Sequence, residues 1–355
     1  MTGPRVAVVG TGLIGTSIAL ALCQEGWDVQ VLDHDPAAAA LAADLGAGQP
    51  WDARGGPVDH VVLAVPPSVV AASLLRAQRS EMGRTFSDTA SVKMKVLAEA
   101  QALDCDLTSW MPAHPIAGRE RGGAARAQAD LFRDRPWALC PVPTTGNAAR
   151  EWSARVASAC GAQVVTLDAE RHDRVMATVS HLPQLLASAL AAVTSRLDES
   201  DLALAGSGLR DMTRLAAAEP ALWADIVGGN AVEVAAAVDL LRSELSRVAP
   251  GGVAVADEVA GLVARGNAGR TRLPDKARAA GRGWTWVSVV VPDEPGELAR
   301  LLAAVGDAGI NVEDLRVEHS PQHAWGLVEL AVEPGAELAL VATADRGGWR
   351  AHPAV

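Results

Sequence analysis

The chain has 355 residues, of which 49% are hydrophobic and 3% aromatic, and it carries a formal net charge of −11 at pH 7. This length predicts two or three domains, each with enough apolar residues for its own core. The acidic balance without a basic run excludes the usual nucleic-acid-binding classes, and no apolar segment approaches the length of a membrane span. We therefore expect a cytoplasmic protein that binds neither nucleic acid nor membrane. The four cysteines have no metal-binding spacing, so we expect free thiols and no metal site.

The first predicted strand ends in a glycine motif, Gly10-Thr-Gly12-Leu-Ile-Gly15, and an amphipathic helix follows it. Gly10 permits a tight turn, Gly12 lets a pyrophosphate approach the backbone, and Gly15 lets the helix pack against the strand. Asp33 ends the next apolar run, about 20 residues farther on, as a dinucleotide site requires. The predicted cofactor-binding residues are Gly10, Gly12, Leu13, Ile14, Gly15 and Asp33.

Asp33 also indicates which dinucleotide binds. Its carboxylate can accept both hydroxyls of the adenosine ribose, whereas it would repel the 2′-phosphate of NADP. The following residues, His34-Asp35-Pro36, include no arginine that would neutralise such a phosphate. The sequence therefore favours NAD.

Strand and helix patterns alternate through the first part of the chain. The periodicities predict helices over 37–45, 69–79 and 147–160, and strands over 58–65, 85–88, 111–114, 137–142 and 162–167. This alternation is typical of an α/β fold with a Rossmann-type, doubly wound parallel sheet. We expect this domain to occupy residues 1–168.

The next part is predicted to be all-helical. Apolar residues recur at helical spacing over 182–197, 203–217, 221–226 and 232–248. Such apolar helices cannot all be buried against the first domain, so we expect one face to contact a second copy of the chain in a homodimer. A looser connection begins at Pro250, and the Gly- and Arg-rich residues 266–283 predict a linker. The helical domain with its linker is expected to occupy residues 169–280.

The last part, residues 281–355, is predicted to be a small α+β domain. Strands are expected over 284–291, 312–317 and 326–332, a helix over 295–309, and a final helix and strand near the end. This order is the ferredoxin-like plan.

Two polar positions follow predicted strands of the first domain, where substrates collect in such folds. His114 can take a proton from a substrate hydroxyl while hydride leaves for the nicotinamide, because the pKa of histidine lies near neutrality. From position alone, a core or capping histidine is equally well supported. Ser91 after a strand is by itself more typical of a helix N-cap.

Motifs spread along nearly the whole chain resemble those of the prephenate dehydrogenase family of tyrosine biosynthesis. They are His114-Pro-Ile-Ala-Gly-Arg-Glu120, Ser180-His-Leu-Pro-Gln184 and Gly208-Leu-Arg-Asp-Met-Thr-Arg-Leu-Ala216. Near the end, Asp293-Glu-Pro-Gly296 and Gly309-Ile-Asn311-Val are similar to an ACT domain. The resemblance implies NAD-dependent oxidative decarboxylation of prephenate to 4-hydroxyphenylpyruvate, with feedback control by tyrosine.

The resemblance also implies roles for single residues. His114 would accept the proton of the C4 hydroxyl, and Ser91 would hydrogen-bond that hydroxyl or the imidazole. Arg214 would clamp a carboxylate of the dianionic substrate with its guanidinium fork. Without the family motif, a solvated Arg214 or its ion pair with Asp211 would be the better reading.

The other expected site residues have less specific roles. His181 and Gln184 would contact substrate, Glu120 and Asp211 would gate the pocket, and Val65 and Pro66 would line the nicotinamide side. Trp223 would close the site from a neighbouring subunit or serve as a core tryptophan. For the regulatory ligand, the expected contacts are Asp293, Gly296 and Asn311; the alternative is a dimerisation module that binds no ligand.

One departure from the family motif affects the substrate. Members often read Ser-His-Leu-Pro-His, whereas this chain has Gln184 in the last place. A neutral amide there favours a substrate with a cationic amine, so arogenate and 4-amino-4-deoxyprephenate stay open as alternatives to prephenate.

Two other classes of protein fit the sequence less well. A non-catalytic sensor of NAD and an amino acid would have lost turnover, but His114, Ser91 and Arg214 are intact. A generic β-hydroxyacid dehydrogenase would place a catalytic lysine on a helix after the nucleotide domain, and no lysine occurs between positions 96 and 275.

Overall fold

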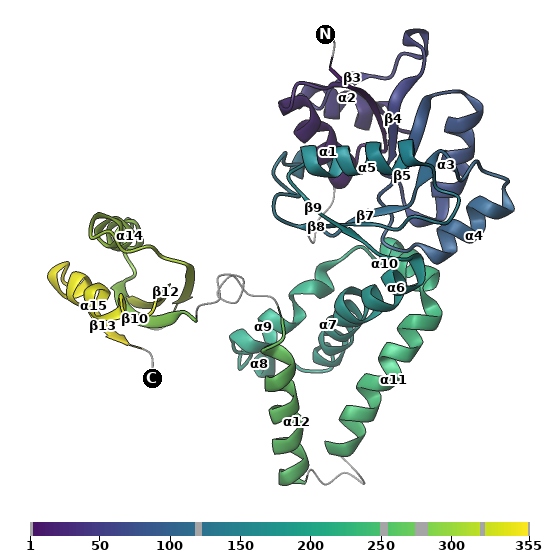
Figure 1. Ribbon diagram of the computed structural model, residues 1–355. Helices are drawn as coiled ribbons and strands as arrows, with labels where there is room; N and C mark the ends of the chain where they lie inside the picture. The colour runs from purple at the N-terminus through teal and green to yellow at the C-terminus, as the bar shows by residue number, and fades with distance from the viewer. Residues whose placement is uncertain (1–2, 118–122, 249–254, 274–282, 320–323, 354–355) are drawn as a thin grey trace. The chain divides into compact units, whose positions relative to one another are not determined.

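The computed structural model describes residues 3–117, 123–248, 255–273, 283–319 and 324–353 (Figure 1). The chain divides into two compact units, Met1–Ser246 and Arg247–Val355. The first unit holds the parallel sheet and the helices that follow it, and the second holds an antiparallel sheet with its own helices.

A six-stranded parallel sheet in the order β3-β2-β1-β4-β5-β6 forms the centre of the first unit. This order and the helices on both faces confirm the predicted Rossmann-type sheet. The strands are β1 Arg5–Val9, β2 Asp28–Leu32, β3 Gln49–Pro50, β4 Val58–Leu63, β5 Gly83–Asp88 and β6 Trp110–Met111. The helices are α1 Leu13–Gln24, α2 Pro36–Asp44, α3 Pro67–Arg79, α4 Met94–Ala102 and α5 Asn147–Ala159, with short 3₁₀ turns η1 Ala53–Gly55 and η2 Ala124–Arg126.

Side chains of β1 alternate between two separate cores, one on each face of the sheet. Val6 and Val8 belong to the core that includes Ile18 and Leu22 of α1. Ala7 belongs to the other core, which includes Leu74 of α3. The period of two along a strand explains this division, because successive side chains point to opposite faces.

Three strands form a second, smaller sheet, which corrects one expectation. The runs expected at 137–142 and 162–167 do not extend the parallel sheet; they become β8 Pro136–Leu139 and β9 Gln163–Thr166 beside β7 Ala113–Pro115. β7 is antiparallel to β8. Pro112 separates β6 from β7 and has no N–H to donate to a ladder, so the chain leaves the first sheet there.

A helical region completes the first unit. It consists of α6 Ala169–Met176, the π-helical turn η3 Ala177–His181, α7 Leu182–Thr194, α8 Glu199–Leu202, α9 Ser207–Thr213, the 3₁₀ turn η4 Arg214–Ala217, α10 Pro220–Gly229 and α11 Ala231–Val248. The expected helix over 203–217 is therefore divided between α9 and η4, and the first helix begins at Ala169 rather than at Leu182.

The run from α6 through α7 also corrects the expectation that no segment approaches the length of a membrane span. Ala169–Thr194 is one helical stretch of 26 residues, long and apolar enough to pass a test of length and composition. It carries buried polar side chains, namely His172, Asp173 and His181. Buried polar groups on a helix point to contacts inside a protein rather than to lipid, which offers them no partners.

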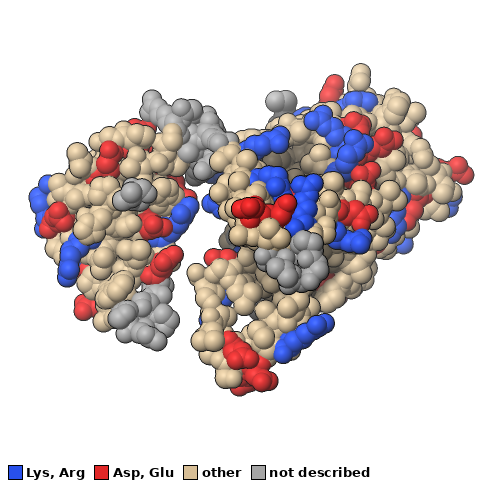
Figure 2. Space-filling model, turned by 90° about the horizontal axis from the view of Figure 1, so that it is seen from below, with Lys and Arg blue, Asp and Glu red and all other residues tan. Residues whose placement is uncertain are grey.

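The helical region also exposes many large apolar side chains. Val232 and Leu240 of α11 are 82% and 70% exposed. On the face drawn in Figure 2, charged side chains of both signs are interspersed with wide areas that carry neither. The exposed apolar residues of this region are Val175, Val179, Val193, Leu197, Leu202, Leu204, Met212, Leu222, Val232, Leu240 and Leu245.

The second unit confirms the ferredoxin-like plan. Its antiparallel sheet has the order β11-β12-β10-β13, with β10 Thr285–Pro292, β11 Asp314–His319, β12 Trp325–Val332 and β13 Arg350–Pro353. The helices α14 Glu297–Asp307 and α15 Glu337–Arg346 pack with the sheet around one core. A further helix, α12 Ala256–Arg270, occupies part of the segment expected to be a looser connection and linker.

Candidate active site

The glycine turn after β1 has the geometry that a dinucleotide requires. Gly10 has φ +97°, and a Cβ there would lie 2.2 Å from the carbonyl oxygen of Ala64. A Cβ on Gly15 would lie 1.9 Å from the carbonyl oxygen of Gly10. Gly12 differs, because it is exposed and a Cβ there would meet no atom of the described residues within 4 Å. Since none of these residues requires a glycine at 12, the open space before α1 fits a pyrophosphate at a helix N-terminus.

Asp33 directly follows β2 and faces this turn. Its Oδ2 accepts hydrogen bonds from the Thr11 backbone N (2.7 Å) and hydroxyl (3.0 Å), and its Oδ1 accepts from the Asp35 N (3.0 Å). Partial burial favours the neutral carboxyl, but the hydrogen bonds from Asp35 and Thr11 outweigh it and lower the pKa of Asp33. The carboxylate is therefore ionised and held where it would meet the ribose of NAD. Leu13 and Ile14 open α1 behind Gly12, and Val65 and Pro66 lie between β4 and α3.

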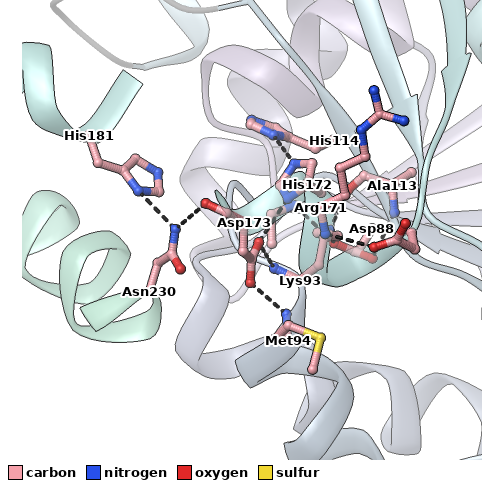
Figure 3. Close-up of polar contacts among 12 residues, drawn as sticks. Asp88, Lys93, Met94, Ala113, His114, Arg171, His172, Asp173, His181 and Asn230 are labelled. Atoms are coloured by element: carbon pink, nitrogen blue, oxygen red, sulfur yellow. Dashed lines mark hydrogen bonds and ion pairs between the residues drawn. The ribbon is translucent and has the colours of Figure 1, made fainter. Parts of the chain in front are cut away.

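His114 lies on β7 at one end of a row of hydrogen-bonded side chains (Figure 3). Its Nδ1 is 2.9 Å from Nε2 of His172, although the two residues are 58 positions apart. Nδ1 of His172 is 2.8 Å from Oδ1 of Asp173. His172 and Asp173 belong to α6 and are almost completely buried. The structure thus places a histidine of the second sheet against two polar residues of the helical region.

Burial keeps these histidines neutral. Desolvation lowers the pKa of His114 well below its usual value, and the nearby His172, Lys93 and His181 lower it further. Desolvation also lowers the pKa of His172, against the opposing hydrogen bond to Asp173. For His181, desolvation lowers the pKa to about 4. A neutral imidazole carries one N–H donor and one lone pair, so each of these rings can donate on one side and accept on the other.

A buried ion pair fixes the strand on which His114 lies. Lys93 and Asp88 are fully buried and paired with each other. Nζ of Lys93 also donates to the carbonyl oxygen of Ala113, and Oδ2 of Asp88 accepts from the Ala113 N (3.2 Å). Both backbone groups of the residue before His114 are therefore held by the two charges.

Asp173 connects the helical region to the loop that carries Lys93. Its Oδ1 accepts from the Lys93 N (2.9 Å) and its Oδ2 from the Met94 N (2.8 Å). These N–H groups open α4, which has no side-chain cap of its own. A carboxylate at this helix N-terminus satisfies two orphan donors and is favoured by the helix dipole.

His181 lies at the end of the π-helical turn, next to Asn230 and Trp223. The Asn230 amide donates to the Asp173 carbonyl oxygen (2.7 Å) and to Nδ1 of His181 (3.3 Å). The proton of the His181 ring is therefore on Nε2, which is buried and has no partner among the residues that the structure describes. The centroid of the Trp223 ring lies 6.2 Å from the centroid of the His181 ring of the same chain, and the two rings meet edge to face.

Gln184 is buried one turn after His181. Its amide nitrogen donates to the Leu215 carbonyl oxygen (2.8 Å) and to the Ser188 hydroxyl (3.2 Å). Leu215 follows Arg214 in the turn η4, so Gln184 ties the turn that carries Arg214 to α7. Asp211 lies on α9, one turn before Arg214.

The other predicted site residues lie in loops, at the ends of elements or outside the described ranges. Ser91 lies in the loop between β5 and α4, two positions before Lys93. Glu120 lies outside the described residues. In the second unit, Asp293 follows β10, Gly296 begins α14 with φ +93°, and the Asn311 amide donates to Glu313. All four cysteines are free, as expected. Within the described ranges, no group of three or more His, Cys, Asp or Glu side chains is placed to hold a metal ion.

Sequence reasoning missed four residues that hold this site together, namely Lys93, His172, Asp173 and Asn230. The adjacent pair His172-Asp173 gave no distinct signal, because it lies among the charged residues Glu170, Arg171 and Arg174 of the same helix. Lys93 lies close to Asp88 and Ser91 in the sequence, but its deep burial is a property of tertiary structure alone.

Comparison with known proteins identifies related sequences along the chain. Three family profiles match it: prephenate dehydrogenase, nucleotide-binding domain, over residues 18–166; prephenate dehydrogenase, dimerization domain, over 168–250; and ACT domain, over 285–343. The protein named Probable prephenate dehydrogenase NovF of Streptomyces niveus is 34% identical over 357 residues, which cover 97% of this chain and 98% of that protein.

Two further relatives extend the comparison. Cyclohexadienyl dehydrogenase of Zymomonas mobilis is 32% identical over 259 residues, 69% of this chain and 87% of that protein. The crystal structure of prephenate dehydrogenase from Aquifex aeolicus with hydroxyphenyl propionate and NAD+ has a TM-score of 0.64 at 24% identity, over 76% of this chain and 94% of that one. The likeness to the Aquifex aeolicus structure shows a shared fold.

Proposed function

The chain belongs to the prephenate dehydrogenase family, and from this premise we propose that it converts prephenate to 4-hydroxyphenylpyruvate by oxidative decarboxylation. It is an NAD-dependent dehydrogenase with a C-terminal ACT domain. The observation that carries the proposal is the neutral His114 imidazole, tied at Nδ1 to a buried partner in the same unit as the glycine turn.

The chemistry requires three bond changes that the site can support. The substrate O–H bond breaks, C4 loses hydride, and the ring carboxylate leaves as CO2 while the ring becomes an aromatic phenolate, which then takes up a proton to give the phenol of the product. NAD, when bound, accepts the hydride. His114 accepts the hydroxyl proton at Nε2, because its Nδ1 is occupied by His172. Ser91 orients the hydroxyl or the imidazole.

The negative groups of prephenate need donors. His181 offers a buried N–H at Nε2 that no described residue accepts, and a neutral donor there suits a carboxylate or keto oxygen. Arg214 supplies the cation for a carboxylate, on a turn positioned by Gln184. Val65 and Pro66 line the nicotinamide side, and Trp223 covers the substrate beside His181.

The test is an assay of NADH formation and CO2 release with prephenate. Equal yields of both products are expected. NADH without CO2 would indicate simple alcohol oxidation, and no NADH with prephenate or its amino analogues would support the sensor reading instead.

A second candidate substrate class is favoured by Gln184. Both hydrogens of its amide are committed to Leu215 and Ser188, so it can offer a substrate only its carbonyl oxygen. An acceptor suits the ammonium of arogenate or of a 4-amino analogue better than the keto group of prephenate. Parallel assays with prephenate and arogenate on the wild type and on Gln184→His distinguish the two, because the substitution should shift the ratio of kcat/KM towards prephenate.

The proposal extends to assembly and control. The exposed apolar side chains of the helical region would be covered in a homodimer of this cytoplasmic enzyme. Tyrosine would bind the ACT domain near Asp293, Gly296 and Asn311, and would inhibit by favouring one of two states. Inhibition of the full chain by tyrosine but not by phenylalanine or leucine would support this role, and no effect would support a dimerisation module.

A further inference from the structure

Polar groups from three elements meet in one directional row at the site. The row runs from the N-terminus of α4 through Asp173 and His172 of α6 to His114 of β7 (Figure 3). The direction of donation is set at one end. The N–H groups of Lys93 and Met94 can only donate, so the Asp173 carboxylate accepts from both.

The same direction of hydrogen-bond donation continues along the row. Oδ1 of Asp173 accepts from Nδ1–H of His172, so the lone pair of a neutral His172 is on Nε2. That lone pair accepts from Nδ1–H of His114. The lone pair of His114 is consequently on Nε2, the atom that a base needs.

The opposite arrangement is disfavoured by burial. It requires a His172 that carries protons on both nitrogens and donates to His114, which would place the His114 proton on Nε2. His172 is 0% exposed, and desolvation lowers its pKa, so the charged ring is costly there.

We propose that His172 and Asp173 are positioning residues that hold the proton of His114 on Nδ1 and so leave its Nε2 free to act as the base. This inference rests on the proposed role of His114 as base. When the substrate O–H bond breaks, an N–H bond forms at Nε2 while the proton on Nδ1 stays in place, and no electron transfer is involved. Among the residues that the structure describes, the other groups that act on the pKa of His114 are Lys93, from the loop before α4, and His181, from η3.

Nitrogen NMR tests the tautomer without any substrate. The chain has eight histidines, so ¹⁵N-histidine labelling gives few signals, and His114→Asn identifies the one of interest. We expect the wild type to show His114 with its proton on Nδ1 and an unprotonated Nε2 at neutral pH. A proton on Nε2 would overturn the proposal even if the enzyme turns over prephenate.

Kinetics of His172→Gln test the consequence. We expect kcat to fall by about 10²-fold or more while KM changes little, because the base is misoriented and substrate contacts remain. The acid limb of kcat/KM should move to higher pH, because His172 contributes to the low pKa of His114. An unchanged kcat and acid limb would overturn the proposal.

His60→Gln is the matched control. His60 is also fully buried and bonded through both ring nitrogens, to the hydroxyls of Thr85 (2.9 Å) and Ser87 (2.8 Å), but it is not part of the row. The His60→Gln variant should have a lower free energy of unfolding than the wild type, but the acid limb of its kcat/KM should not shift. If the wild type fails to oxidise prephenate or its amino analogues, the proposed function fails, whereas the NMR result still decides the tautomer.

Discussion

At the scale of single residues, His114 depends on its surroundings for its chemistry. A solvated histidine is partly charged near neutral pH, whereas desolvation and the nearby His172 and Lys93 keep this ring neutral. The sequence shows the motif around His114, but it does not show the protonation state of the ring. Its partner His172 lies 58 positions away along the chain, and Lys93 belongs to another loop, so both become neighbours of His114 only in the folded chain.

Removing the imidazole should abolish turnover and spare cofactor binding. For His114→Asn we expect kcat to fall by about 10²- to 10⁴-fold, the usual range for a lost general base. NAD affinity, measured by fluorescence titration, should stay within about twofold because Asp33 and the glycine turn are unaffected. Unchanged turnover would refute the role of His114.

The same lowered pKa predicts the pH dependence. As the proposed base, His114 must be unprotonated to act, so kcat/KM should stay level as pH falls through 6.5, the usual histidine value, and should decline only as pH reaches the lowered pKa of His114. Return of full activity at pH 7 after each acid exposure separates titration from unfolding. An acid limb centred at 6.5 or above would contradict a desolvated base.

Arg214 should act mainly on substrate binding. Arg214→Ala is expected to raise KM by about 10- to 100-fold, which corresponds to about 1.5–3 kcal/mol for a hydrogen-bonded charge, with a smaller effect on kcat. Arg210→Ala, on the neighbouring helix α9, is the control. An unaltered KM in Arg214→Ala would count against the clamp.

At the scale of elements, the sequence predicted local features better than the pairing of segments that are distant along the chain. The glycine turn, the strands β1, β2, β4 and β5 of the parallel sheet and the βαββαβ order of the second unit all follow from short periodicities, and they are confirmed. The separate sheet of β7, β8 and β9 was missed, because an apolar run does not state which strand it will pair with. The helix α12 was missed because its glycines, Gly266 and Gly269, are typical of linkers.

The junction of β5, β7 and α4 also depends on one buried pair that the sequence does not reveal. Lys93 neutralises Asp88 inside the protein, so Lys93→Met should leave a buried carboxylate without its cation and lower the free energy of unfolding by about 3–5 kcal/mol. Urea denaturation measures this change. The double variant with Asp88→Asn should recover part of the loss, and a single variant as stable as the wild type would show that the pair is dispensable.

At the scale of the whole molecule, the apolar helices need a partner surface. Val232 and Leu240 of α11 are exposed in the single chain, which is unfavourable for large apolar side chains in such numbers. The sequence predicted this excess from composition, but not which side chains would be exposed, since that depends on how the helices pack.

Charge on this surface should weaken association. The variant Val232→Asp with Leu240→Asp is expected to shift the enzyme from dimer towards monomer in sedimentation velocity, because a dimer interface would have to bury both charges. Ser243→Asp, at an exposed polar position of the same helix, should leave the dimer intact. A double variant that sediments like the wild type would place the interface elsewhere.

The carboxylate of Asp173 has a consequence for how such enzymes can evolve. It belongs to the helical region, yet it caps a helix of the nucleotide-binding fold and ends the row that reaches His114. If recombination joined the nucleotide-binding fold to an unrelated helical region, the product would still bind dinucleotide. His114 would then lack the residues that position it. The two halves are therefore expected to be inherited together, while the ACT module, which supplies no atom to this row, is free to be gained or lost.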